Sequence, residues 1–147
     1  MKDPALTIRT AYYNALNNIV QFNSAPVPFY TQVPSGSAFP YMYVSDFTSV
    51  EDVIADKNVF CLDCTMTVVC CMKYPGNSGG FADVDGISAQ VIEIIRGDTT
   101  QSTPLPFLPD WQHVICCLAG GNEMKTEVTD GIIFSRILKF RHRIYQL

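Results

Sequence analysis

Six cysteines and two histidines are the residues of this 147-residue chain that could bind a metal or carry redox chemistry. Cys61 and Cys64 have the Cys-x-x-Cys spacing of zinc sites and dithiol redox centres. The pair lies in a run of alternating apolar and polar residues, and in a strand an offset of three puts the two thiols on opposite faces. No second Cys-x-x-Cys or His-x-x-His follows. The pattern favours core thiols, and the alternative is a metal-dependent enzyme with Cys61, Cys64 and His113 as ligands.

The other candidate catalytic groups lack the neighbours that a reaction needs. Neither His113 nor His142 has a sequence partner typical of a catalytic unit. Residues 76–80 (Gly-Asn-Ser-Gly-Gly) precede a predicted helix but contain no Gly-Lys-Ser/Thr phosphate-binding sequence. Asp83 and Asp85 suit the positive end of that helix. We therefore expect no catalytic residue, no cofactor and no bound metal.

Charge is distributed unevenly along the chain. The formal net charge is −4, yet residues 131–147 contain four basic side chains and no acidic one. The basic residues are Arg136, Lys139, Arg141 and Arg143. The first 130 residues hold six basic and fourteen acidic side chains. An acidic isoelectric point of about 4.9 argues against a dedicated nucleic-acid-binding protein. The basic segment is either a solvated strand face or an electrostatic contact with an acidic neighbour or with nucleic acid.

Length and composition predict one domain over residues 1–147. No apolar run approaches the roughly 18–20 residues of a membrane span, so we expect no membrane partner. The first residues have no apolar signal segment, which predicts a reducing cytoplasm and free thiols.

The first half of the chain is expected to form one helix and several strands. Asp3 and Pro4 suit the start of a helix that fades near Asn23, with a buried stripe at three- and four-residue steps. The stripe consists of Ile8, Tyr12, Leu16 and Ile19. Short extended segments are predicted at 29–33 and 41–44, followed by an acidic loop or arm over 46–58. Strict alternation from Val59 to Tyr74 predicts a long strand that extends beyond the core.

The second half is expected to add a helix and a group of strands. A helix begins near Phe81 and ends at Gly97, with its buried stripe at Val84, Ile87, Val91, Ile94 and Ile95. A proline-rich connection follows over 103–109. Strands are predicted over 113–118 and 123–128, joined by a turn at residues 120–122, and a last strand runs over 132–145. The predicted class is α+β: an antiparallel sheet of four or five strands, two helices on one face, and a projecting long strand or hairpin. Such a chain suits subunit contacts better than catalysis.

The order of elements resembles that of the tail-terminator, or tail-completion, proteins of tailed bacteriophages. The resemblance rests on the helix opened by Asp3-Pro4, the segment Tyr30-Thr31-Gln32-Val33-Pro34, and the strand entry Ala38-Phe39-Pro40-Tyr41-Met42-Tyr43-Val44. It implies a structural virion protein without catalytic residues, forming a hexameric ring at the head-tail junction. The implied partners are other copies of the chain, the tail tube and the head connector. DNA would pass through the lumen without specific binding, and assembly would take place in the bacterial cytoplasm.

Two features depart from that family: a long proline-rich segment over 99–109 and a high cysteine content. They leave open a neck or connector ring, or a tail-tube-like subunit, of a short-tailed phage. In a ring, each subunit places one surface against a different surface of the next. The interface prediction therefore sets Arg136, Lys139, Arg141 and Arg143 against Asp46, Glu51, Asp52 and Asp56 of a neighbouring copy, or against an adjacent ring.

Overall fold

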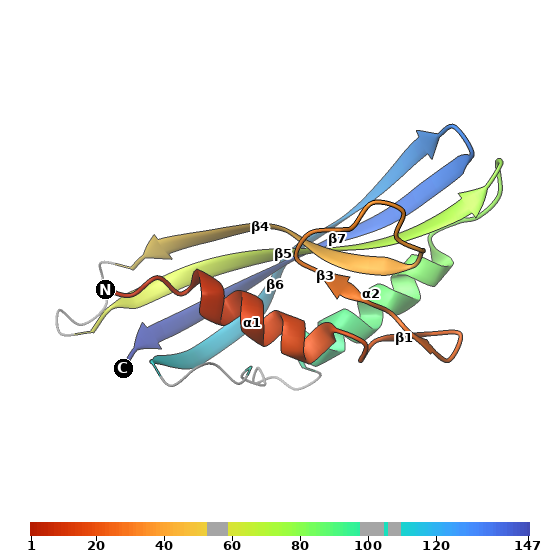
Figure 1. Cartoon of the computed structure of the whole chain (residues 1–147). Coiled ribbons are helices and arrows are strands. Elements are labelled where there is room, and N and C mark those ends of the chain that lie inside the picture. Colours follow the sequence, from red (N-terminus) through yellow and green to blue (C-terminus); the bar gives the residue numbers. More distant parts are fainter. Residues whose placement is uncertain (53–58, 98–104, 106–109) are drawn as a thin grey trace.

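The computed structural model describes residues 1–52, 59–97, 105 and 110–147 (Figure 1). The two helices are α1 (Ala5–Leu16) and α2 (Ala82–Ile95). The short strands are β1 (Gln21–Phe22), β2 (Ala25–Pro26) and β3 (Phe29–Tyr30). The long strands are β4 (Tyr41–Glu51), β5 (Cys61–Pro75), β6 (Trp111–Val128) and β7 (Gly131–Gln146). The predicted proline-rich connection lies outside the described residues except for Leu105, which is buried.

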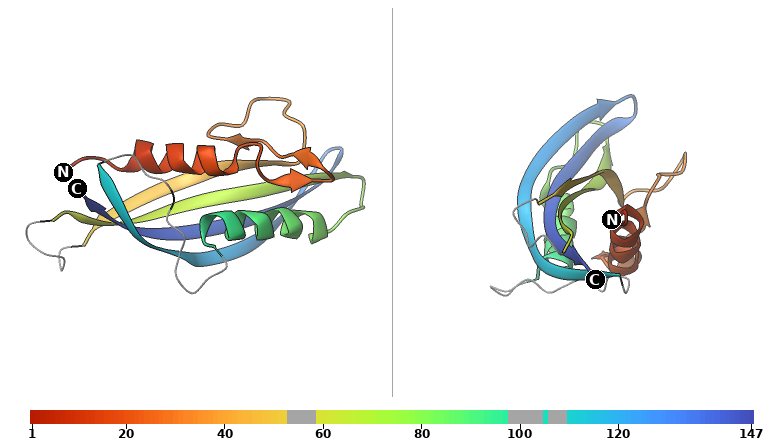
Figure 2. Two further views of the ribbon diagram at one scale, coloured as in Figure 1. Left: turned by 90° about the horizontal axis from the view of Figure 1, so that it is seen from below. Right: turned by 90° about the vertical axis from the view of Figure 1, so that its left-hand side faces the viewer.

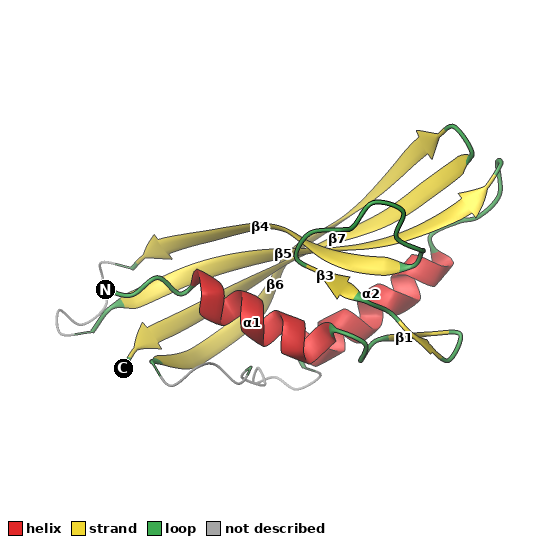
Figure 3. Ribbon diagram, viewed as in Figure 1, coloured by secondary structure: helices red, strands yellow, loops and turns green. Residues whose placement is uncertain are grey.

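Five strands form one sheet in the order β3-β4-β5-β7-β6 (Figure 3). The four long strands pair antiparallel, and β3 pairs parallel with β4 over two residues. β1 and β2 form a separate two-stranded sheet. The sheet is strongly curved, and both helices lie on one face of it (Figure 2). The predicted α+β class and strand number are confirmed, and the short parallel pair is the exception to an antiparallel sheet.

The core lies between the helices and the two central strands. Alternate residues of β5 and β7 face the helices, as the period of two in a strand requires. From β5 these are Leu62, Cys64, Met66, Val68 and Cys70, and from β7 they are Phe134, Leu138, Phe140, His142 and Ile144. The helices contribute Ile8, Tyr12 and Leu16 from α1 and Val84, Ile87, Val91 and Ile95 from α2. Both helices therefore pack against the sheet through the apolar stripes that the sequence predicts.

The ends of α1 differ from the prediction. Pro4 occupies the N-cap position and not the first helical position, and the Asp3 carboxylate accepts a hydrogen bond from the Ala5 N–H at 3.0 Å. The helix ends at Leu16 and not near Asn23, because Asn18 adopts a left-handed conformation with φ of 59°. Ile19 lies beyond this end and is 56% exposed, so its predicted place in the buried stripe is wrong.

The second helix matches its prediction closely. Phe81 is its N-cap, and Ile94 is partly buried against the core. Gly97 follows the C-cap with φ of 81°, and its N–H donates to the Glu93 carbonyl at 3.0 Å. This left-handed residue satisfies a helix-end carbonyl and stops the helix.

The predicted acidic loop over 46–58 is wrong in its first part. β4 continues through Glu51, with an irregular register between Val44 and Phe47. Asp46 lies inside this irregularity, where an extra residue is accommodated as in a β-bulge. Residues 53–58 lie outside the described part of the chain.

The predicted turn at residues 120–122 is also wrong. β6 runs without interruption through Gly120 and Gly121, and its register with β7 shifts between Leu118 and Gly120. Glycines within a strand often mark such irregularities. The hairpin turn consists of Thr129 and Asp130, which the sequence indicated only as an interruption. The predicted projecting hairpin is present at this end, where residues 121–130 are all exposed (Figure 1).

Two glycines should respond in opposite ways to replacement by alanine. A Cβ on Gly131 would lie 2.2 Å from the Tyr74 carbonyl oxygen, so Gly131→Ala must force the two strands apart. We expect a loss of about 1–3 kcal/mol in the free energy of unfolding. A Cβ on Gly86, within α2, meets no atom within 4 Å. Gly86→Ala should stabilise the chain by roughly 0.5–1 kcal/mol through helix propensity. Urea unfolding of both variants tests this, and equal effects would contradict it.

Candidate interaction surface

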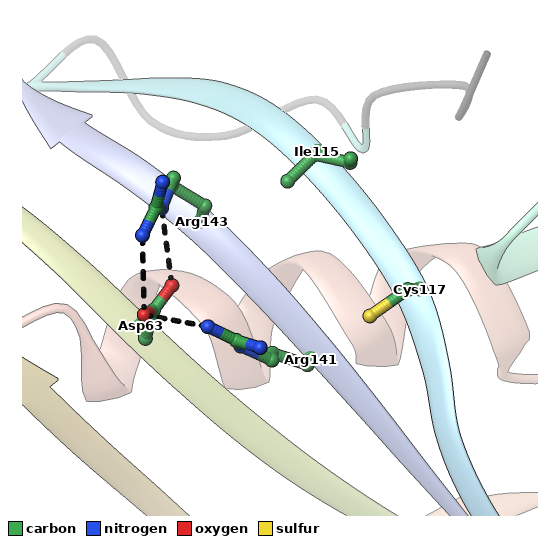
Figure 4. A pocket seen from close by; sticks show the side chains of 5 residues that line it. All are labelled: Asp63, Ile115, Cys117, Arg141 and Arg143. Atoms are coloured by element: carbon green, nitrogen blue, oxygen red, sulfur yellow. Dashed lines mark hydrogen bonds and ion pairs between the residues drawn. The ribbon is translucent and has the colours of Figure 1, made fainter.

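The face of the sheet opposite the helices carries a cluster of paired charges. We call this face the outer face, and the group Asp52, Asp63, Arg141 and Arg143 the outer charge cluster. Asp63 on β5 lies opposite Arg143 on β7 in the strand register, so the pairing of the two strands sets their distance. Asp63 accepts from Arg141 at 2.9 Å and from Arg143 Nε at 3.3 Å (Figure 4). Arg143 also forms an ion pair with Asp52.

The two arginines determine the ionisation of Asp63. Partial burial opposes the charged form of this carboxyl group. The hydrogen bonds and charges of Arg141 and Arg143 outweigh that effect and hold the pKa of Asp63 below its usual range. Each pair is accessible to solvent, and exposed pairs of this kind are worth up to ~1 kcal/mol. The cluster thus fixes the directions of side chains more than it stabilises the fold.

A hollow of about 230 Å³ lies beside this cluster. Ile115 and Cys117 of β6 complete its lining with Asp63, Arg141 and Arg143 (Figure 4). Ile115 is 52% exposed, so an apolar side chain lies open to solvent beside the charged groups. Among the lining residues that the structure describes, no histidine stands near the Cys117 thiol as a base.

The four predicted basic residues divide between the two faces of the sheet. Arg136 lies on the helix face, beside Ser88 and Ile92 of α2, and pairs with Glu123 at 3.1 Å. Arg141, Arg143 and Lys139 alternate with it and therefore lie on the outer face. Lys139 is exposed and forms no ion pair with any described residue.

The four predicted acidic residues are not gathered in one place. Asp46 and Glu51 are exposed on β4, and neither forms an ion pair within the described part of the chain. Asp52 follows β4 and is paired with Arg143 of the same chain. Asp56 lies outside the described residues. Asp63, which the sequence analysis did not single out, is the acid that contacts two of the basic residues. Its position among alternating residues gave its face, but only the register with β7 gives its partners.

A second polar group, the buried triad, lies on the helix face and consists of Tyr12, His113 and His142. The Tyr12 hydroxyl hydrogen-bonds His142 Nε2, and His113 Nε2 lies 3.0 Å from His142 Nδ1. His142 is fully buried. The triad joins α1, β7 and β6 inside the core.

Burial controls the protonation of the triad. Burial, together with the neighbouring His113, lowers the pKa of His142 to about 3. Burial likewise lowers the pKa of His113 and raises that of Tyr12 well above its ordinary value. All three groups are therefore neutral near pH 7. A neutral His142 has one N–H and one acceptor nitrogen, so it donates to one of Tyr12 and His113 and accepts from the other.

The six cysteines are free thiols in the structure. Cys61 and Cys64 lie opposite Tyr145 and His142, and thus point to opposite faces of β5. Within residues 1–52, 59–97, 105 and 110–147, no three His, Cys, Asp or Glu side chains are placed to hold a metal ion. No helix in the same residues has the length and apolar character needed to cross a membrane.

Comparison with known proteins finds similarity among solved structures. No protein-family model matches the sequence, and no curated protein matches it significantly. Among solved structures, a chain from the virion of a native gene transfer agent (GTA) particle is similar, with a TM-score of 0.72. This chain shares the fold of that virion chain. The match covers 99% of each chain at 16% sequence identity, so it includes both helices and all four long strands.

The buried triad should make stability fall in acid. His142 has a pKa near 6.5 when unfolded and about 3 when folded. The unfolded chain therefore takes up a proton first as pH falls below 6.5, and stability decreases towards pH 3. The loss between pH 7 and pH 5 should be about 2 kcal/mol from this residue.

His142→Gln keeps an acceptor for the Tyr12 hydroxyl but does not titrate. Its free energy of unfolding should be lower at pH 7 and depend less on pH between 7 and 5. Urea unfolding measured at several pH values checks this, and an unchanged slope would exclude His142 as the source.

Proposed function

We propose that this chain is a structural protein of a virus-like particle, and that it forms a hexameric ring at the head-tail junction which terminates or completes the tail. The observation that carries the proposal is the match over 99% of both chains to a chain of a GTA virion. The order of elements, which resembles that of tail-terminator proteins, supports the more specific assignment. The protein would act by binding copies of itself and adjacent virion proteins, without catalysis.

The distribution of polar groups supports a non-enzymatic role. His142 and Tyr12 are fully buried, and His113 is partly buried in contact with His142. The hollow on the outer face has its two arginines already paired with acids. These arrangements stabilise and orient the chain, whereas a catalytic group needs access to a substrate.

The exposed charges supply the proposed contacts between subunits. Lys139 and the exposed side of Arg141 lie on the outer face of β7, one strand from the β6 margin. Asp46 and Glu51 lie on β4, at the opposite side of the sheet. A ring joins opposite sides of neighbouring copies, so a head-to-tail arrangement brings the β4 edge with Asp46 towards Lys139, whereas Glu51, opposite Leu62, lies on the helix face. Arg143 and Asp52 form an ion pair within one chain, so they would contact a neighbouring copy together. Arg136 lies on the helix face.

The other proposed partners follow from the place of such a ring in the particle. The tail tube and the head connector would contact its two ends, and DNA would pass through its lumen without specific binding. The ring would be assembled in the bacterial cytoplasm and remain in the virion. A neck ring or a tail-tube-like subunit is the alternative, and a tube subunit would polymerise without stopping.

Purified protein should form a closed ring of about six copies, seen by sedimentation velocity and negative-stain electron microscopy. Open-ended tubes would favour the tube alternative, and a strictly monomeric protein at high concentration would refute the proposal.

Lys139→Glu should weaken the ring by at least about tenfold in dissociation constant without lowering the melting temperature, because Lys139 has no ion-pair partner among the described residues of its own chain. Lys2→Glu is the matched control: it makes the same change of charge at the exposed Lys2–Asp110 pair. Equal assembly of the two variants, measured by sedimentation equilibrium, would remove Lys139 from the interface.

A further inference from the structure

The sheet has two long edges that no described strand covers. β6 pairs with β7 along one side, and its other side has no strand partner among the described residues. At the opposite margin, β3 covers β4 only at Met42 and Tyr43, which leaves Val44–Glu51 open within the described chain. Natural proteins usually protect such edges because their free N–H and C=O groups pair with other strands.

The distal half of β6, Gly121–Val128, is the less protected part of its edge. Both register shifts of β6 lie before it, between His113 and Ile115 and between Leu118 and Gly120. From Gly121 onwards every residue pairs regularly with β7, and all eight residues are exposed. The segment contains no proline, and its charged residues are Glu123, Lys125 and Glu127. It is a regular strand edge that extends beyond the helices (Figure 1).

The number of long strands fits a joint between identical copies. β4, β5, β7 and β6 alternate in direction, so β4 and β6 run antiparallel to each other. If the next copy continues the same sheet, its β4 therefore meets β6 in the antiparallel sense. An odd number of alternating strands would have made this joint parallel.

The charged residues beside the open edge of β6 differ from those beside the open edge of β4. Lys139 lies opposite Gly120, which has no side chain and leaves Lys139 room to extend towards the open edge, whereas Arg141, opposite Cys117, is directed to Asp63 of β5. Pairing of β6 with a second β6 would bring two such basic groups together. Pairing of β4 with a second β4 would bring Asp46 and Glu51 against their own copies. The β6–β4 joint sets the side of the sheet that holds Lys139 against the edge that holds Asp46, while Glu123 and Glu127 lie on β6 itself.

We propose that the ring closes by strand addition, with Gly121–Val128 of one copy pairing antiparallel with Val44–Glu51 of the next copy. This inference rests on the proposed ring. Antiparallel pairing sets Gly121 opposite Glu51 of the neighbour, and both residues lie on the helix face, because Gly121 is level with Leu138 and Glu51 with Leu62. Towards the other end of the joint, Lys125 meets Phe47 and Thr126 meets Asp46.

The strand offset that this pairing requires is compatible with a closed cylinder. Within one copy, Glu51 is level with Ile144 of β7, whereas Gly121 is level with Leu138. Neighbouring copies are therefore shifted along the strand direction by six residues, or roughly 20 Å at 3.3 Å per residue. The four long strands of one copy span roughly 19 Å in the perpendicular direction. The resulting strand tilt is about 45°, at the upper end of the range seen in closed β-barrels.

Adjacent proline variants test the joint. Successive residues of a strand direct their N–H groups to opposite edges, so one of Lys125 and Thr126 donates to β7 and the other points outwards. Of Lys125→Pro and Thr126→Pro, one should lower the melting temperature. The other should keep the melting temperature within a few degrees of wild type and sediment as a monomer where wild type forms rings. Lys125→Ala and Thr126→Ala, which keep the N–H, are the matched controls and should still form rings.

Hydrogen exchange provides a readout that needs no substitution. Amides within 121–128 and 44–51 should exchange at least tenfold more slowly in the wild-type ring than in dilute monomer. Two results would overturn the joint while leaving the ring intact. One is normal ring formation by the proline variant that keeps its melting temperature, and the other is unchanged hydrogen exchange in both segments. A dimer that protects only 121–128 would also overturn it. Wild-type protein that never assembles would overturn the ring itself.

Discussion

The pairing of β5 with β7 is the interaction on which the rest of the structure depends. Fifteen consecutive residue pairs join them, from Cys61–Tyr145 to Pro75–Gly131, without a shift in register. One face of this pair forms the floor of the core under both helices. The other face sets Asp63 against Arg141 and Arg143. A slip of one residue would exchange the two faces, burying arginines under the helices, so burial and charge together fix a single register.

The pattern of apolar and polar residues correctly predicted the elements in which buried residues recur at a regular spacing. The alternation of β5, the stripe of α2 and the stop at Gly97 each reflect a constraint contained in a few neighbouring residues. The predictions were wrong where the local structure depends on residues distant in the sequence. Gly120 and Gly121 suit a turn when considered alone, but the long β7 strand beside them keeps β6 extended. The close approach of the Tyr74 carbonyl to Gly131 could not be inferred from glycine positions.

The sequence predicted which basic residues belong to the candidate surface, but it did not predict which acidic residues they contact. The sequence located the basic segment, and its alternation already separates Arg136 from Lys139, Arg141 and Arg143. It did not single out Asp63, because the partners of a charged strand residue depend on register across the sheet. The buried triad was missed for a related reason. Tyr12 had been assigned to an apolar stripe, and its hydroxyl meets His142 from the opposite end of the chain.

That link between Tyr12 and His142 joins residues 130 positions apart, and Lys2 donates to the Gln146 side chain across 144. The central strand β7 comes last among the described elements, so the floor of the core and the partner of the first helix are added only after every other described element has been synthesised. The topology is dominated by contacts between distant residues, for which slow folding is typical. A partly synthesised chain accordingly exposes the apolar faces of β5 and of both helices until β7 pairs with β5.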